Sequence, residues 1–373
     1  MTQPLSVAGD LLWLTAALVD VPSVSRSEAQ LADVVEAALD AVPELIVLRV
    51  GDSVVARSEA GRERRVLLAG HLDTVPPFGD VSATVHEDAV SGLGAVDMKG
   101  GLAVMLSLAG EVARAAVDVT FVFYAGEEIE RDANALAAMA RDGAAWLQAD
   151  MAVLGEPTGG VVEAGCQGTM RAVIRVGGRR AHTARPWTGT NAVHRLGAVL
   201  RMLDDYAPRP VELEGCVYTE QLQAVRVEGG VAGNVVPDSA SVTVNYRFAP
   251  DRDAAAAERE LRRMFASVLD EEAGDRLEVV DVAEGAPPAL ANAFVADLVE
   301  ATGAPARAKV GWTDVATLAS LGIPSANFGP GDPLLAHTPD ERVTRQELVD
   351  VRRVLARLLG LPGDGVGAED RGR

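Results

Sequence analysis

The sequence predicts an α/β fold with a mainly parallel sheet, interrupted by a small α+β domain. Over about residues 44–157, short apolar strand-like runs alternate with runs of helical length, an order typical of a parallel sheet covered by helices. After about residue 168, apolar and polar residues alternate with the period of half-exposed strands. From about residue 285 the first pattern returns, so we expect the second domain to be inserted into the first.

Residues 1–167 form the first part of the predicted α/β domain. Its strand-like segments, ELIVLRV, VLLAGHLD, VTFVFYAGEE and ADMAVLGEP, are short and apolar. Between them lie GGLAVMLSLAGEVARA and NALAAMARDGAAWL, which have the length and composition of helices. Strands that alternate with helices favour a largely parallel sheet.

Residues 168–284 form the predicted inserted domain. Its strand-like segments are TMRAVIRVGG, LQAVRVEGG and SASVTVNYRFAP, and its helical segments are NAVHRLGAVLRMLDDY and DAAAAERELRRMFASVL. We expect the order strand, helix, strand, strand, helix, strand, in a small sheet with one face covered.

Residues 285–362 complete the α/β domain. They contain the helical segment NAFVADLVEAT, a short strand near PSANFGPG, and a final helix, TRQELVDVRRVLARLLGL. Residues 363–373, GDGVGAEDRGR, are expected to be a disordered tail.

Composition excludes some classes of function. The chain has 373 residues, of which 48% are apolar, enough for two well-packed domains. Its net charge of −20 argues against nucleic acid as a partner, because phosphates require a basic face. The charge does not favour an anionic membrane surface either. An acidic substrate would have to be bound by local Arg or Lys side chains.

We expect a cytoplasmic protein. Cys166 and Cys216 are the only cysteines, too few for a disulfide framework and without the spacing of a metal site; both are expected to be buried. Near the N-terminus, Leu11, Leu14 and Leu18 fit one face of a helix. No basic region precedes them, so this patch fits a helix better than a signal peptide.

Five loops carry acidic or histidine residues in a shared context, each after a strand-like run or among Gly and Pro residues. They are GHLDTVPP with His71 and Asp73, GLGAVDMKGG with Asp97, YAGEEIE with Glu127 and Glu128, LGEPTGG with Glu156, and LLAHTPDE with His337. Ligands of α/β sheets bind outside the carboxyl ends of the strands, so several of these groups are expected to gather there.

Each of these motifs alone has an ordinary structural explanation. A single His after a strand is more often a loop or core residue, and a Glu pair is usually a solvated turn. Together, however, two His and three carboxylates supply the imidazole and carboxylate ligands of two divalent cations, with one carboxylate bridging. Adjacent carboxylates such as Glu127 and Glu128 make sense if one binds a cation and the other handles a proton.

Together, GHLDTVP, DMKGG and AGEE resemble the M20 family of dizinc aminoacyl and peptide hydrolases, and the resemblance covers nearly the whole chain. It implies a zinc-dependent exopeptidase-like catalytic domain interrupted by a lid domain. It implies two Zn²⁺, with Co²⁺ as an alternative at one site, and a cis peptide after Asp97. At matching positions it implies His71 and Glu156 at one zinc, Glu128 and His337 at the other, Asp97 bridging them, Glu127 as general base, and Asp73 orienting the His71 imidazole.

The inserted segment resembles the family's lid domain, which mediates dimerisation in many members. GGRRAHTARP places His182 where the family has a histidine that reaches a neighbouring active site and stabilises the oxyanion; the alternative is a surface histidine on an edge strand. Asn234 in GNVVPD and Arg247 in NYRF match positions that contact the substrate's carboxylate end, although Arg247 could instead form a structural salt bridge. Thr313 in GWTD is a further substrate-binding candidate. The resemblance favours a homodimer in which His182 acts in trans.

The segment AKVGWTDVATLASLGIPSANFGPGDPLLAHTPDE is similar to succinyl-diaminopimelate desuccinylases of the actinobacterial type. The similarity implies hydrolysis of N-succinyl-LL-2,6-diaminopimelate to succinate and LL-2,6-diaminopimelate, in lysine and diaminopimelate biosynthesis. Acetylornithine deacetylases and N-acyl-amino-acid amidohydrolases share the zinc motifs and stay open as alternatives. A non-catalytic binding protein of this fold is disfavoured because all five ligands, Glu127 and Asp73 are present.

Overall fold

The computed structural model describes residues 5–77, 82–143 and 145–361, and its chain divides into two compact units. The large unit comprises Met1–Gly165, Pro288–Arg307 and Thr313–Arg373, and the small unit comprises Cys166–Pro287 and Ala308–Trp312. The predicted tail, residues 363–373, lies outside the described residues.

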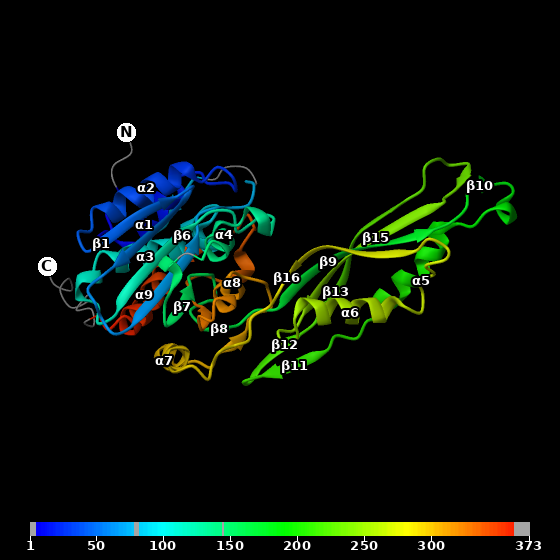
Figure 1. The fold of residues 1–373 in the computed structure, drawn as a ribbon. Helices are drawn as coiled ribbons and strands as arrows, with labels where there is room; N and C mark the ends of the chain where they lie inside the picture. Colours follow the sequence, from blue (N-terminus) through cyan, green and yellow to red (C-terminus); the bar gives the residue numbers. More distant parts are fainter. Residues whose placement is uncertain (1–4, 78–81, 144, 362–373) are drawn as a thin grey trace. The chain divides into compact units, whose positions relative to one another are not determined.

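The large unit is built on one mixed sheet (Figure 1). Four adjacent strands at its centre, in the order β6-β3-β7-β18, run parallel to one another. At one edge β2 joins β6 antiparallel and β1 joins β2 antiparallel. In spatial order the strands are β1 (Leu45–Val50), β2 (Ser53–Ser58), β6 (Asp118–Tyr124), β3 (Arg65–His71), β7 (Met151–Leu154), β18 (Ser325–Asn327), β8 (Glu163–Ala164) and β17 (Arg307–Ala308). The predicted α/β class is confirmed.

The helices of the large unit bury apolar faces against this sheet. Every residue of β6 is buried, and so is every residue of β3 after Arg65, as expected for strands covered on both faces. Within the shared core, α3 contacts both α1 and α9, and α9 also contacts α7. The helices of this unit are α1 (Leu11–Val19), α2 (Ala29–Asp40), α3 (Gly100–Ala109), α4 (Ala135–Arg141), α7 (Ala293–Thr302), α8 (Val315–Ser320) and α9 (Arg345–Leu358).

A second, three-stranded sheet in the large unit joins segments that are distant in sequence. Its order is β19 (Arg342–Thr344), β5 (Ala89–Ser91) and β4 (Thr84–Val85). The antiparallel pairing of β19 with β5 places Arg342 opposite Ser91. The loop that precedes β19 is therefore held beside the loop that follows β5, which leads to Asp97.

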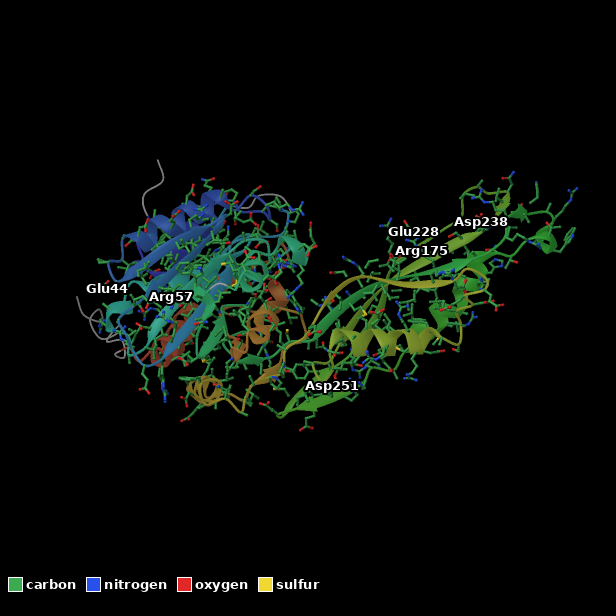
Figure 2. All side chains as sticks on the ribbon, viewed as in Figure 1. Glu44, Arg57, Arg175, Glu228, Asp238 and Asp251 are labelled. Atoms are coloured by element: carbon green, nitrogen blue, oxygen red, sulfur yellow. The ribbon has the colours of Figure 1, made fainter. Side chains whose placement is uncertain are left out.

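The small unit is a four-stranded antiparallel sheet with two helices (Figure 1). The strand order is β13 (Gln221–Gly229), β15 (Ser239–Phe248), β9 (Gly168–Gly177) and β16 (Arg276–Ala283). Apolar side chains on one face form a core with α5 (Ala192–Asp204) and α6 (Ala254–Phe265). In β9 the alternate residues are the more exposed ones, as Arg175 illustrates, whereas most of β13 is exposed, Glu228 included (Figure 2). Two short pairs, β10 (Ala181–His182) with β14 (Val235–Val236) and β11 (Pro210–Leu213) with β12 (Cys216–Thr219), complete the unit.

Candidate metal centre

The candidate site is assembled at the carboxyl ends of the parallel strands of the large unit. His71 is the last residue of β3, and Glu127 and Glu128 follow β6. Glu156 follows β7, which pairs with β3 on the side away from β6. Because parallel strands end at the same edge of a sheet, these three loops converge.

Asp97 and His337 reach the same place from loops outside the central strands. Asp97 precedes α3, and the peptide bond between Asp97 and Met98 is cis, as the family resemblance implies. His337 lies before β19 with a positive φ of 61°, a left-handed conformation that is uncommon for residues other than Gly. A residue held in such a conformation is often found at a functional site.

The distances among these side chains suit a shared metal centre. The His71 Nε2 atom lies 3.0 Å from Asp97 Oδ1, while His337 Nε2 lies 3.4 Å from Asp97 Oδ2 and 2.8 Å from Glu128 Oε1. The two oxygens of Asp97 thus face different histidines, the arrangement that a bridging carboxylate needs. Ligand atoms lie within 4.8 Å of one another in three sets: His71, Asp97 and Glu156; Asp97, Glu128 and His337; and His71, Glu127 and Glu128.

The two imidazoles are surrounded by carboxylates. Burial lowers the pKa of His71, but hydrogen bonds and charge interactions with Asp73 and Asp97 raise it well above the usual value. Hydrogen bonds to Asp97 and Glu128 raise the pKa of His337 to about 10. Both shifts indicate a strongly negative environment, which favours any cation placed between these groups.

The carboxylates of the centre differ in their pKa. Burial opposes ionisation of Asp97, yet its contacts with His337 and His71 bring its pKa well below the usual range. Burial raises the pKa of Glu127 well above its usual value, although His71 opposes this shift. Glu127 therefore favours its protonated form more than an exposed carboxyl group does, and a nearby cation would oppose this shift.

The donor set fits divalent cations. Among the described residues, Asp97 and Glu128 form their ion pairs with histidines, and none of those pairs involves Lys or Arg. Imidazole nitrogens and carboxylate oxygens are ligands of Zn²⁺ and of related transition-metal ions. The residues present therefore fit the implied metal centre in number, type and spacing.

Asp73 holds the backbone of the adjacent Glu pair. Its Oδ1 and Oδ2 atoms accept hydrogen bonds from the backbone N–H groups of Glu127 and Glu128, each at 3.0 Å. The Ser25 hydroxyl donates to Oδ2 at 2.8 Å. Although burial opposes ionisation, His71 and these two backbone donors lower the pKa of Asp73 to about 2. Asp73 is therefore a buried anion that fixes the loop carrying Glu127 and Glu128.

The His71 ring is oriented by the Asp73 residue through two atoms. The Nδ1 atom lies 3.0 Å from the backbone oxygen of Asp73 and 3.6 Å from its Oδ1 atom. A proton on Nδ1 donated to this carbonyl leaves Nε2 free to act as a ligand. Ser25 was not identified from the sequence, because a single serine in a loop before a helix gives no specific signal.

Three other predicted site residues lie in the small unit. His182 and Asn234 are exposed and Arg247 is half-buried, with its Nε donating to Asn245 Oδ1 at 3.1 Å. The pairing of His182 with Val235 in β10 and β14 places Asn234 next to the His182 strand. Thr313 is in the large unit, where its buried hydroxyl donates to Asn327 Oδ1 at 2.8 Å. Contact of these four side chains with a substrate stays a prediction.

The comparisons with known proteins identify the family. A family model described as peptidase family M20/M25/M40 matches residues 67–360. The chain belongs to this family. A succinyl-diaminopimelate desuccinylase of Corynebacterium glutamicum is 41% identical over 95% of the chain and 97% of the relative. A Mycobacterium tuberculosis protein that carries the same enzyme name provisionally is 52% identical over 95% of the chain and 99% of the relative. This M20 member is therefore a metal-dependent hydrolase.

Two solved structures share the fold at low sequence identity. Aminopeptidase PepT of Bacillus cereus superposes with a TM-score of 0.77 at 18% identity, over 95% of this chain and 99% of that one. An M20 metallo-carboxypeptidase of Sulfolobus solfataricus gives a TM-score of 0.74 at 15% identity over the same shares of the two chains.

Within the described residues, no helix is long and apolar enough to cross a membrane.

Proposed function

We propose that this M20 hydrolase cleaves N-succinyl-LL-2,6-diaminopimelate to succinate and LL-2,6-diaminopimelate in the cytoplasm. The convergence of two histidines and four carboxylates at one end of the parallel sheet supports amide hydrolysis. The 41% identical corynebacterial relative supports the choice of substrate. The two cysteines, both free and buried, are compatible with a reducing compartment.

In this proposal two Zn²⁺ ions, or Zn²⁺ with Co²⁺ at one site, occupy the centre. His71 and Glu156 hold one ion, Glu128 and His337 hold the other, and Asp97 bridges them. When bound, such ions lower the pKa of water and polarise the scissile carbonyl. The supporting geometry is the division of the Asp97 oxygens between the two histidines.

Glu127 is proposed as the general base. It is the additional carboxylate of the cluster, beyond the five proposed ligands, and its backbone N–H is fixed by Asp73. From that position Glu127 takes a proton from the attacking water and later gives it to the leaving amine. Its neighbour Glu128 occupies the ligand position, so the two adjacent carboxylates have different tasks.

His182 is proposed to stabilise the oxyanion, acting across a homodimer formed through the lid. Its Nδ1 atom accepts the backbone N–H of Ala184 at 3.0 Å. In the neutral ring the proton is therefore on Nε2, which the exposed side chain offers as a donor. Arg247, Asn234 and Thr313 are proposed to contact the substrate, with the Arg247 guanidinium suited to a carboxylate.

A parallel hydrolysis assay tests this proposal. Zinc-loaded enzyme is compared on N-succinyl-LL-diaminopimelate, N-acetylornithine and a simple N-acyl amino acid, with a chelator control. We expect the largest kcat/KM for the succinyl substrate, and loss of activity on chelation. Preference for N-acetylornithine or the N-acyl amino acid would reject the substrate assignment, and no hydrolysis of any would favour a binding protein.

A further inference from the structure

A second buried carboxylate holds the backbone beside the proposed bridging ligand. Glu341 is 3% exposed and lies between the His337 loop and β19. Its Oε1 atom accepts the backbone N–H of Val96 at 2.9 Å and that of Asp97 at 3.0 Å. One oxygen thus satisfies two consecutive donors, one of which belongs to Asp97 itself.

This arrangement repeats the one at Asp73. Asp73 follows His71 and accepts two consecutive backbone N–H groups of another ligand loop, those of Glu127 and Glu128. Glu341 follows His337 and does the same for the loop that carries Asp97. Each candidate histidine ligand is therefore followed in the chain by a carboxylate that fixes a different ligand loop.

The position of Glu341 is fixed by the surrounding protein. Its backbone oxygen accepts the Gly92 N–H at 3.1 Å, and the next residue, Arg342, pairs with Ser91 in the small sheet of β19 and β5. Lys99 is 2% exposed, donates its Nζ to the Val21 backbone oxygen at 2.8 Å, and interacts through its charge with Glu341. These contacts with protein groups hold the carboxylate in place.

We propose that Glu341 is a positioning residue that fixes Asp97 so that its two oxygens face His71 and His337. This inference rests on the metal centre proposed above. Metal and catalytic sites need their groups held within about 0.5 Å of the productive geometry. Replacing residues that orient metal ligands typically changes metal affinity by roughly 10–100-fold. Glu341 supplies that constraint to Asp97 through the peptide backbone.

Two conservative variants separate the hydrogen-bond acceptor from the charge. Glu341→Gln keeps an amide oxygen at the same reach, where it can accept both N–H groups, but removes the charge near Lys99. Glu341→Asp keeps the charge but is one methylene shorter and withdraws the acceptor. A positioning role through the backbone predicts that the Gln variant resembles the unsubstituted protein and that the Asp variant does not. A purely electrostatic or packing role predicts the reverse or no difference.

The readouts are ion binding and spectroscopy. Apoprotein is titrated with Zn²⁺ by calorimetry, and with Co²⁺ by visible absorption, which reports the coordination geometry. In Glu341→Asp we expect affinity for one of the two ions to fall roughly 10–100-fold with an altered Co²⁺ spectrum. In Glu341→Gln we expect both ions to bind within about threefold of the unsubstituted affinity.

Asp118→Asn is the matched control. Asp118 is also a buried carboxylate that accepts two backbone N–H groups, from Ala60 and Arg62, but it begins β6, at the end of the strand away from Glu127. This variant should bind both ions as the unsubstituted protein does. An Asp118→Asn variant that loses ion affinity as Glu341→Asp does would show a general effect of buried carboxylates and overturn the proposal.

The remaining outcomes are distinguishable. Suppose the unsubstituted protein binds two ions. If Glu341→Asp then binds both with unchanged affinity, or if Glu341→Gln binds them more weakly than Glu341→Asp does, only the role of Glu341 is overturned. Fewer than two ions in the unsubstituted protein would overturn the proposed centre and this inference together. Amide exchange of the unsubstituted apoprotein adds a test without substitution: slow exchange at Val96 and Asp97 is expected, and rapid exchange at both would contradict the proposal.

Discussion

The buried carboxylates of the small unit and the carboxylates of the candidate metal centre have different partners. In the small unit, Asp275 is fully buried and receives a bidentate pair from Arg195, with Nη1 at 3.0 Å from Oδ1 and Nη2 at 2.8 Å from Oδ2. Glu220, 1% exposed, is held by Arg209 in the same two-pronged manner and also accepts from Tyr246. At the candidate metal centre of the large unit, the ion pairs of Asp97 and Glu128 are formed with histidines alone within the described residues.

The difference separates structural anions from functional ones. A bidentate arginine supplies both charge and hydrogen bonds, so Asp275 and Glu220 stabilise the fold of the small unit without further ligands. Where the described ion pairs of Asp97 and Glu128 are with imidazoles, negative charge is left for an external cation to balance. Substitutions in the metal-centre cluster should therefore change turnover more than the stability of the fold. Substitutions in the Arg–carboxylate pairs of the small unit should change stability more than turnover.

The largest effect is expected for Glu127→Gln. Removing the proposed base should lower kcat by roughly 10²–10⁴-fold, while zinc content and thermal stability stay unchanged because the backbone contact with Asp73 remains. Steady-state kinetics and metal analysis measure the two properties. Glu130→Gln, at an exposed residue of the same loop that pairs with Arg26 on the surface, is the control. Full turnover by Glu127→Gln would assign the proton transfer to another group.

His182→Ala tests the one residue of the small unit to which we assign chemistry. Loss of an oxyanion donor should lower kcat by roughly 10²–10³-fold, with metal content unaffected. His194→Ala is the matched control because His194 is also an exposed histidine of the small unit, in α5. Equal kcat values for both variants and the unsubstituted enzyme would make His182 a surface residue.

Asp275→Asn should act on folding alone. The substitution leaves Arg195 without its anionic partner; breaking a buried pair costs about 3–5 kcal/mol, and since the Arg195 side chain is 26% exposed we expect about 2 kcal/mol. Urea denaturation, monitored by amide exchange in β9 and β15, measures this loss in the free energy of unfolding. The number of zinc ions bound should equal that of the unsubstituted protein. Asp281→Asn removes a surface pair with Arg171, both about half exposed, and should change stability by less than about 0.5 kcal/mol. A loss of bound zinc in Asp275→Asn would contradict the separation of the two kinds of carboxylate.

Much of the fold was predictable because apolar periodicity is local information. The predicted apolar runs coincide with β3, β6 and β7, and the strands of the four-stranded sheet of the small unit and its two helices follow one another in the predicted order. The short strands β10, β11, β12 and β14 of the small unit were not predicted. β2, Ser53–Ser58, was not predicted, since its sequence SVVARS is short and its place in the sheet depends on pairing with β1 and β6. The helical run of residues 134–147 ends early, at Arg141, because Gly143 adopts a positive φ of 67°.

The candidate site was predictable as a set of residues, but its supporting contacts were not. His71, Asp97 and His337 stood out as chemically distinctive side chains in loops. Glu341 stood in the same loop as His337 without a distinguishing feature, because its importance lies in two backbone N–H groups about 245 residues earlier. A contact of that kind depends on the pairing of β19 with β5, which has no local sequence signal.

The smallest expected effect comes from substituting Asp118, a buried carboxylate of the large unit that lies outside the metal centre. It tests whether the local environment of a carboxylate, and not the unit to which it belongs, decides its role. Burial opposes its ionisation, but the backbone N–H groups of Ala60 and Arg62 and the hydroxyl of Ser58 bring its pKa below the usual 3.8. The ionised form therefore stabilises the folded state above the unfolded-state pKa, and this contribution is lost as pH falls through the lower folded-state pKa. At neutral pH, Asp118→Asn should reduce the free energy of unfolding by about 1 kcal/mol, at the low end for a buried acceptor.

Urea denaturation of the two apoproteins between pH 7 and pH 3 measures the Asp118 contribution, and apoprotein avoids the release of metal by acid. The stability difference between the unsubstituted protein and Asp118→Asn should be constant above about pH 5 and shrink toward pH 3. Ion binding by the variant should be unchanged. A constant difference over the whole range would show that Asp118 stabilises the fold without its charge. A variant that lost ion affinity would place this carboxylate with those of the metal centre and remove the distinction drawn between structural and functional anions.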